Sequence, residues 1–383
     1  MAIADAVVAR EMATRVERAM PGIKETFSRQ SILLWLAKKK GNIKYGLSGT
    51  TFEWYIRKDS STAPSWGGGE LGTRTFEEID PASRCWLPFC YIEKGYGIGQ
   101  RTMESGKNAA GYRKVYDSLK ENLEVAKIGL WDAVLPTVYT GGGPAVTAGN
   151  GGDQPIGIEK ACGDCYQNTE DVAVTALQQY ANQTLNTSAI AGGPSTEASW
   201  DSKYYYPVVT CLNEIPGVSS DADAVWKTDC LIALGYMAGV MERTASVTGT
   251  GKPIKPDLAI MDAARFQVVK NKIIAAQGTG YQIPLGRKDI ILGGFPSFTV
   301  DTLEVVKDTD IGTDSGGGIR VFCLDSNEFK VYTTHNKSEG LIISAFDAEN
   351  PAVSGAIGVL RMNLGWAIMP TAIGCIVGTD DTA

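Results

Sequence analysis

The sequence predicts an α+β protein in which an extended two-stranded hairpin and one long helix precede a mixed domain. The hairpin is predicted over 43–98, where aromatic and aliphatic residues alternate with polar ones at a spacing close to two. The helix is predicted over about 102–135, where apolar residues recur every three or four positions. From 158 to 345, strand-like and helical runs follow one another, which is typical of an α+β domain.

An N-terminal arm is predicted over 1–42. Its first twenty residues place charges in every turn and predict an amphipathic helix, and a second apolar run follows at 27–36. No secretory signal and no stretch of 18 uninterrupted apolar residues is found. We therefore expect a cytosolic protein without a membrane span, with its eight cysteines reduced and buried.

The predicted hairpin needs a surface to lie on. Tyr45, Phe52, Trp54 and Ile56 alternate with polar residues on the way out, and the return run 84–92 is equally rich in aromatic residues. A two-stranded ribbon of this length cannot bury its own apolar side chains and is marginally stable alone in water. We therefore expect the hairpin to lie on a neighbouring copy of the chain, which predicts a protein that assembles.

The long helix is predicted from one apolar stripe with charged residues on the opposite face. The stripe consists of Tyr112, Val115, Tyr116, Leu119, Leu123, Ala126, Leu130 and Val134. Pro136 is expected to end the helix, because proline removes a backbone donor and clashes with the preceding turn. A flexible connector rich in glycine and proline follows at 140–157.

Further elements are predicted from apolar runs in the second half of the chain. The run 226–243 is apolar nearly all round, so it is predicted to be a buried helix. The other predicted elements are a buried strand at 256–261, a helix at 263–274, strands at 290–300, 320–325 and 328–334, and an apolar pair of elements at 355–369.

Catalytic and metal-binding patterns are weak in this sequence. The single histidine, His335, lies in a polar stretch and is expected on a surface loop. Cys162 and Cys165 have the spacing of half a zinc site, but no second pair completes it. The glycine-rich segment 249–253 departs from a phosphate-binding loop, because Pro253 replaces the hydroxyl residue that binds the metal. We predict no catalytic residue, no cofactor and no metal; a soluble hydrolase or redox enzyme using Cys162, Cys165 or His335 is the alternative.

The composition predicts a folded, acidic protein. The chain is 44% hydrophobic and 21% charged, and its formal net charge is -7. An acidic chain gains little from counterion release on a phosphate backbone, which argues against a dedicated nucleic-acid binder. The short basic run Lys38, Lys39 and Lys40 is typical of a solvated helix face.

Several segments, taken in their order along the chain, resemble the major capsid proteins of tailed phages, whose fold encapsulin shells share. Residues 43–57 (IKYGLSGTTFEWYIR) resemble the rising strand of the extended loop in that family, and 84–135 resemble its return strand, polar turn and long helix. Three further segments are similar to parts of these proteins, namely 191–200 (AGGPSTEASW), 255–261 (KPDLAIM) and 321–334.

The resemblance implies the tailed-phage major capsid fold. This fold has an N-terminal arm, an extended β-hairpin loop (E-loop), a peripheral (P) domain with a long spine helix, and an axial (A) domain. The implied bounds are 1–42 for the arm, 43–98 for the E-loop and return strand, 99–150 and 320–345 for the P domain with its spine helix at 102–135, and 151–319 and 346–383 for the A domain.

The same resemblance implies a major capsid protein that self-assembles into the icosahedral head shell of a tailed bacteriophage and encloses double-stranded DNA without catalysis. Its implied partners are its own copies in pentamers and hexamers, a portal protein, scaffolding or decoration proteins, and packaged DNA that it contacts non-specifically. Such a protein is expected in the virion, assembled in the host cytoplasm. The alternative on the same fold is an encapsulin-like compartment shell.

The site residues that the resemblance suggests lie mainly on the hairpin, where aromatic and charged side chains are expected to contact the adjacent subunit. The predicted contact residues are Phe52, Trp54, Arg57, Lys58, Trp66, Arg74, Glu77, Glu78, Arg84, Trp86 and Phe89. The tip glycines Gly67, Gly68 and Gly69 are predicted to act as a hinge, and Lys38, Lys39 and Lys40 to face the packaged DNA.

Overall fold

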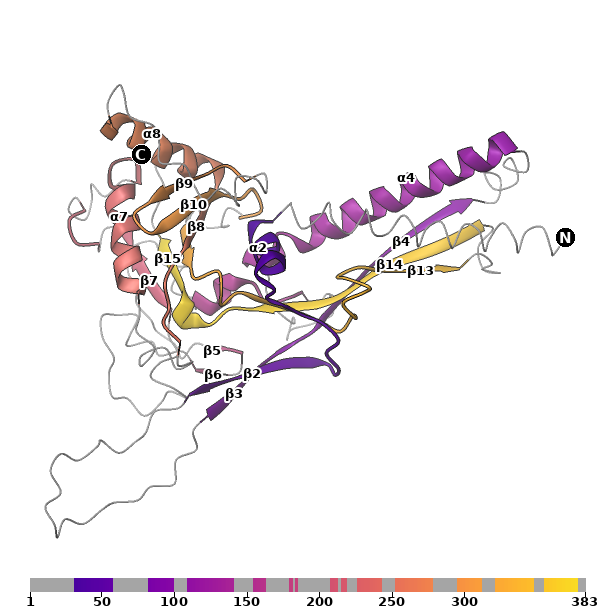
Figure 1. Cartoon of the computed structure of the whole chain (residues 1–383), viewed down its shortest axis with the longest axis horizontal. Helices are drawn as coiled ribbons and strands as arrows, with labels where there is room; N and C mark the ends of the chain where they lie inside the picture. The colour runs from indigo at the N-terminus through magenta and orange to yellow at the C-terminus, as the bar shows by residue number, and fades with distance from the viewer. Residues whose placement is uncertain are drawn as a thin grey trace, which may run out of the picture.

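The computed structural model contains two large sheets, one long helix and two separate pairs of strands (Figure 1). It describes residues 31–57, 82–99, 109–140, 154–162, 179–181, 183–184, 207–212, 215–218, 226–242, 252–277, 295–311, 321–347 and 355–377. All structural statements below concern these residues.

The first sheet, here called the long sheet, has β14 (Gly355–Ala367) at its centre. One edge of β14 pairs antiparallel with β4 (Cys90–Gly99), and the other edge pairs with β13 (Ile343–Asp347) and β12 (Lys330–Thr333). The two-residue strand β1 (Ile43–Lys44) is added to β12 in parallel. In this way an early segment of the chain becomes part of a sheet built mostly from its C-terminal part.

The second sheet, here called the six-stranded sheet, mixes parallel and antiparallel pairs. Its order is β7 (Val208–Cys211), β15 (Ile373–Val377), β11 (Val321–Leu324), β8 (Leu258–Met261), β10 (Leu303–Lys307) and β9 (Ser297–Val300). The central strands carry apolar residues at successive positions and are buried on both faces, as expected for a sheet covered on both sides.

Two helices cover one face of the six-stranded sheet. Helix α7 (Trp226–Met241) and helix α8 (Ala263–Gln277) pack there on Ala259, Met261 and their neighbours in the sheet. The prediction that the first of these helices is buried all round was wrong. Ile232 is 44% exposed and Val240 is 42% exposed, because only one side of α7 rests on the sheet.

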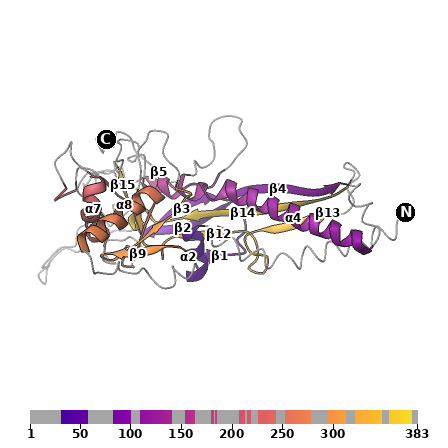
Figure 2. The same ribbon diagram turned by 90° about the horizontal axis from the view of Figure 1, so that it is seen from above.

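Helix α4 (Ala109–Val134) lies along the long sheet, beside β4 and β14 (Figures 1 and 2). The predicted apolar stripe is confirmed where side chains are described, since Leu119, Leu123, Ala126, Leu130 and Val134 are all buried. The Asn122 amide also donates a 2.9 Å hydrogen bond to the Gly97 carbonyl of β4. Positions 102–108 of the predicted helix and the side chains of its first turns lie outside the described residues.

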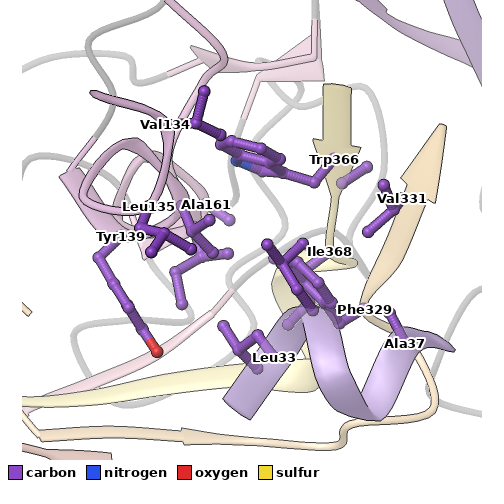
Figure 3. Packing of buried hydrophobic residues seen from close by; sticks show 14 of the residues in the cluster. Leu33, Ala37, Val134, Leu135, Tyr139, Ala161, Phe329, Val331, Trp366 and Ile368 are labelled. Atoms are coloured by element: carbon purple, nitrogen blue, oxygen red, sulfur yellow. The ribbon is translucent and has the colours of Figure 1, made fainter. Parts of the chain in front are cut away.

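A smaller group of helices packs where the two sheets meet (Figure 3). It consists of α2 (Ile32–Lys40), α5 (Thr137–Thr140) and the short 3-10 helices η2 (Ile158–Cys162) and η6 (Pro370–Ala372). Helix α2 ends at Gly41, whose φ of 73° is left-handed. The N–H of Gly41 bonds to the carbonyl of Lys38, and that of Asn42 bonds to the carbonyl of Ala37, so the terminal carbonyls are satisfied.

The sheet pairing of two strands differs from the grouping in the expected domain bounds, which stay a prediction. Strand β11 was expected in the P domain with the long helix, but it pairs with β8 and β15 in the six-stranded sheet. Strand β14 was expected in the A domain, but it is the central strand of the long sheet. Sequence order does not predict which sheet either strand joins, because the chain crosses from one sheet to the other twice within its last sixty or so residues.

The loop that contains His335 is covered rather than exposed, which corrects the expectation of a surface histidine. Gly46 donates its N–H to the His335 carbonyl at 2.9 Å, and Leu47 donates to the Thr333 carbonyl at 3.3 Å. The segment after β1 therefore lies over this loop. Burial lowers the pKa of His335 below its ordinary value.

The described cysteines are all buried, in agreement with the sequence-based expectation. Seven cysteines lie in the described part of the chain, and none of these seven forms a disulfide. Cys162 is among them, whereas Cys165 lies outside the described residues.

Acidic residues gather where the end of α4 and α5 approach the end of β10. The Tyr139 hydroxyl donates a 2.6 Å hydrogen bond to Asp308, and both residues are buried. Partial burial, together with the charges of Asp308 and Asp132, raises the pKa of Asp310 to about 6. Between its ordinary value of 3.8 and about 6, the folded chain therefore binds this proton more tightly than the unfolded chain.

Asp310→Asn is expected to raise the melting temperature at pH 7. The ionised Asp310 costs stability in the folded state, so the stability of the wild type falls as pH rises from about 4 to 6. Solvent screening of this half-buried group limits the gain to about 1 kcal/mol. Thermal unfolding at pH 7 and pH 4 measures the effect, with Asp301→Asn in an exposed turn as the control. An equal gain at both pH values would contradict the prediction.

Candidate subunit interface

The hairpin strands β2 (Thr51–Arg57) and β3 (Ala82–Pro88) pair antiparallel and form a sheet of their own. The predicted strand 43–57 is interrupted, because Gly46 and Gly49 adopt positive φ between β1 and β2. The chain thus turns away from the long sheet before the hairpin begins. The segment between β2 and β3 lies outside the described residues.

One face of the hairpin, here called the inner face, is buried against the body of the same chain. It carries Phe52, Ile56, Cys85 and Leu87. The Phe52 ring stacks on Tyr332 with ring centroids 4.3 Å apart.

The Phe52 ring also occupies the space directly above Gly365 of β14. A Cβ atom at position 365 would lie 2.3 Å from Cε1 of that ring. The absence of a side chain at Gly365 therefore lets the aromatic ring reach the long sheet, and the base of the hairpin is fixed to its own subunit.

A small neighbouring strand pair is hydrogen-bonded to the edge of β3 that does not pair with β2. This pair consists of β5 (Gln179–Tyr180) and β6 (Gln183–Thr184). The N–H of Trp86 donates to the Ala181 carbonyl at 3.1 Å, and the Gln183 side-chain amide donates to the Arg84 carbonyl at 2.9 Å. The backbone of β3 is therefore held in place while its alternate side chains point away from the body.

The opposite face of the hairpin, here called the outer face, is open. The strand register places Glu53 opposite Trp86 and Tyr55 opposite Arg84. Tyr55 is 63% exposed and Trp86 is 38% exposed. Arg84 and Glu53 form an ion pair between the two strands, and both side chains keep a large exposed surface.

The outer face has the composition of a protein-binding surface. Tryptophan, tyrosine and arginine are the residues that most often dominate the binding energy of protein interfaces. Tyr55 and Trp86 lie on adjacent strands of a held backbone, so little side-chain or loop entropy is lost when a partner covers them.

The structure separates the predicted contact residues into groups. Phe52 is only 3% exposed and is already covered by its own chain, so its predicted contact with an adjacent subunit was wrong. Trp54 and Phe89 are half-buried and lie against Phe52, with ring centroids 6.2 and 5.1 Å away. Arg84 and Trp86 are exposed, and their contact with another copy stays a prediction.

The remaining predicted hairpin residues are not described by the structure. Only the backbone of Arg57 is described. The others, which lie outside the described residues, are Lys58, Trp66, Gly67, Gly68, Gly69, Arg74, Glu77 and Glu78.

Tyr55 was missed by the sequence-based reasoning. It lies between Trp54 and Ile56, so alternation along the strand assigns it to the face opposite Phe52. The same alternation is therefore the signal that could have found Tyr55.

The three lysines that were predicted to face DNA differ in their exposure and contacts. Lys38 and Lys39 are exposed, and the Lys39 ammonium lies 5.0 Å from the centre of the Trp35 ring. Lys40 instead forms an ion pair with Asp257 at 3.0 Å inside the subunit. Its expected DNA-facing position was therefore wrong, because Lys40 points from the end of α2 toward the six-stranded sheet.

Within the residues that the structure describes, no group of three or more His, Cys, Asp or Glu side chains is arranged to hold a metal ion. None of the described helices is both long enough and apolar enough to cross a membrane.

Comparison with known proteins gives a result for solved structures alone. No protein-family model and no curated protein sequence matches the chain. The chain is similar to one in the capsid asymmetric unit of cyanophage A-1(L), with a TM-score of 0.52 and 12% identity over 89% of this chain and 92% of that one. The chain has the phage capsid fold.

Two further capsid structures have comparable coverage. A chain from the capsid of a native GTA particle gives a TM-score of 0.49 at 13% identity, covering 90% of each chain. A chain from the capsid of the Myoviridae phage XM1 gives 0.48 at 12% identity, covering 90% of this chain and 92% of that one. The likeness to the cyanophage A-1(L) chain confirms the predicted fold class, an α+β chain with the phage capsid fold. The equivalence of the hairpin to an E-loop and of α4 to a spine helix stays a prediction.

Proposed function

We propose that this chain is the major capsid protein of a tailed bacteriophage, the repeated subunit of an icosahedral head shell that encloses double-stranded DNA. Its role is structural, without catalysis. The observation that carries this proposal is the capsid fold combined with an outer hairpin face that is exposed on a single chain. In Figure 1 the hairpin strands β2 and β3 lie at the lower margin of the described part of the chain.

The partner of the outer face is another copy of the same chain. The hairpin contacts the body of the adjacent copy, so the contact is heterologous, and heterologous contacts form rings when the rotation between copies closes. Pentamers and hexamers are the rings of an icosahedral shell. Each buried Trp or Tyr at the centre of an interface contributes about 2 kcal/mol or more, and a closed shell repeats that contribution many times.

A major capsid protein has further partners and a place in the virion. A portal protein, scaffolding or decoration proteins and packaged DNA complete the head, which assembles in the host cytoplasm and becomes part of the virion. The exposed Lys38 and Lys39 would contact the DNA through charge alone, without reading its sequence.

Negative-stain electron microscopy of the purified full chain, with light scattering after size exclusion, tests this function. We expect shells, rings or capsomers whose fraction rises with protein concentration. Uniform monomers under all conditions would overturn the proposal. Shells that contain a cargo enzyme and no DNA when isolated from the native source would instead favour an encapsulin-like compartment.

A further inference from the structure

Two short connections carry the chain between the long sheet and the six-stranded sheet. Residues 325–329 lead from β11 to β12, and residues 368–372 lead from β14 to β15. The N–H of Asp325 donates to the Ala372 carbonyl at 3.0 Å, so the two connections are bonded to each other. This pair of connections is here called the junction.

Helix α2 packs directly on the junction. Figure 3 shows Leu33 and Ala37 of α2 beside Phe329 and Ile368, one from each connection. All four side chains are buried. The helix itself leads into β1, which pairs with β12, so α2 belongs to the long sheet by connectivity.

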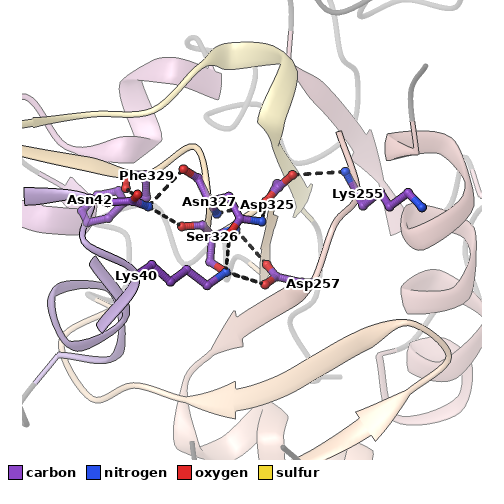
Figure 4. Close-up of polar contacts among 8 residues, drawn as sticks. All are labelled: Lys40, Asn42, Lys255, Asp257, Asp325, Ser326, Asn327 and Phe329. Atoms are coloured by element: carbon purple, nitrogen blue, oxygen red, sulfur yellow. Dashed lines mark hydrogen bonds and ion pairs between the residues drawn. The ribbon is translucent and has the colours of Figure 1, made fainter. Parts of the chain in front are cut away.

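Lys40, the last residue of α2, reaches from there to the other sheet (Figure 4). Its ammonium group donates to Asp257 at 3.0 Å, to the Asn327 side-chain carbonyl at 2.9 Å and to the Ser326 hydroxyl. Asp257 directly precedes β8 of the six-stranded sheet, whereas Ser326 and Asn327 lie in the junction. An ammonium has three N–H donors, and here all three have acceptors.

Asp257 and Asn42 extend this network. Asp257 accepts hydrogen bonds from the backbone N–H of Ser326 at 2.8 Å and from its hydroxyl at 2.6 Å. The Asn42 side-chain amide donates to the backbone carbonyls of Asn327 at 3.0 Å and Phe329 at 3.1 Å. The junction is thus bonded to side chains from both sheets, in addition to its own backbone bond.

Charge makes Lys40 the key member of the network. Asp257 and Asp325 lie on either side of Ser326, and burial followed by the charge of Asp257 raises the pKa of Asp325 above its ordinary value. Removing the ammonium leaves these two acidic residues together at a site that is largely withdrawn from water. The junction then loses three charge-assisted hydrogen bonds at once.

We propose that Lys40 and Asn42, held by helix α2, form a clamp that fixes the long sheet and the six-stranded sheet in one relative orientation, and that loss of the clamp frees the junction to flex. The three consecutive lysines of α2 therefore differ in role. Lys40 serves internal geometry, whereas Lys38 is exposed.

Hydrogen exchange of the full chain, comparing Lys40→Met with Lys38→Met, tests the clamp. Both variants remove one lysine charge from the same helix turn. Exchange of amides 325–331 is expected to be at least about tenfold faster in Lys40→Met than in Lys38→Met, while β8 and β14 keep their protection. Equal exchange in the two variants, or uniform acceleration across both sheets, would overturn the proposal.

Ser326→Ala provides a second variant if Lys40→Met fails to fold. It removes the hydroxyl between Lys40 and Asp257 but keeps their ion pair, so a smaller acceleration confined to the same amides is expected. No local change in Ser326→Ala would overturn the proposal.

The relative orientation can be measured directly. Nitroxides attached to p-acetylphenylalanine at the exposed positions Tyr91 in β4 and Ile274 in α8 report the distance between the two sheets. With labelled chains diluted into unlabelled ones, we expect a broader distance distribution in Lys40→Met than in Lys38→Met. Equal widths would overturn the clamp. Neither measurement requires a shell, so the result is independent of the proposed function.

Discussion

Gly365→Ala is expected to lower the free energy of unfolding by about 3 kcal/mol and to detach the hairpin from its own subunit. The added Cβ would lie 2.3 Å from Cε1 and 2.9 Å from Cζ of Phe52, distances that packed carbon atoms do not adopt. The ring is enclosed by Tyr332 and Phe89 and has little room to move away. Chemical unfolding of the full chain, followed by tryptophan fluorescence, measures the loss.

Gly95→Ala in β4 is the matched control, because a Cβ at that position would meet no atom within 4 Å. A second test introduces Gly365→Ala into a Phe52→Ala chain. With the ring removed, the alanine at 365 is expected to cost less than about 1 kcal/mol, so the two substitutions are strongly non-additive. Additive costs would show that the Phe52 ring is not what requires a glycine there.

Replacing Tyr55 and Trp86 together by serine is expected to abolish assembly while leaving the fold intact. Both side chains are exposed on the single chain, so their truncation costs little folding free energy. If each contributes about 2 kcal/mol to the contact, association weakens by about a thousandfold. Light scattering and electron microscopy measure assembly, and thermal unfolding verifies the fold.

Tyr91→Ser is the control for this prediction, since Tyr91 is also an exposed tyrosine but belongs to β4 of the long sheet and not to β2 or β3. We expect it to assemble like the wild type. Equal loss of assembly in both variants would mean that the outer face has no special role. Normal assembly of the Tyr55→Ser, Trp86→Ser chain would remove the hairpin from the interface altogether.

The hairpin shows what the alternation of apolar and polar residues along a strand can predict and what it cannot. The spacing of Phe52, Trp54 and Ile56 correctly located an extended segment with one apolar face. It could not tell whether that face lies on another molecule or on the same one. The answer depends on Gly365 and Tyr332, which are about three hundred positions away in the sequence.

The division of strands between the two sheets could not be predicted for a related reason. Local patterns predicted β11 and β12 as strands and 355–369 only as an apolar pair of elements. Which strands pair with each other depends on packing between residues distant in the sequence. At 325–329 and at 368–372 the chain passes from one sheet to the other within a few residues. No change in composition marks either crossing.

The sequence alone determined the elements whose signal is periodic and local. Helix α4, the strand–helix unit of β8 and α8, and the aromatic hairpin follow from spacing, because a repeating backbone geometry turns sequence intervals into faces. Only the tertiary structure decided that Lys40 is internal while Lys38 is exposed, that His335 is covered, and that Tyr55 rather than Phe52 faces outward. The physical reason is that burial and pairing are set by residues distant in the chain, and no local interval encodes them.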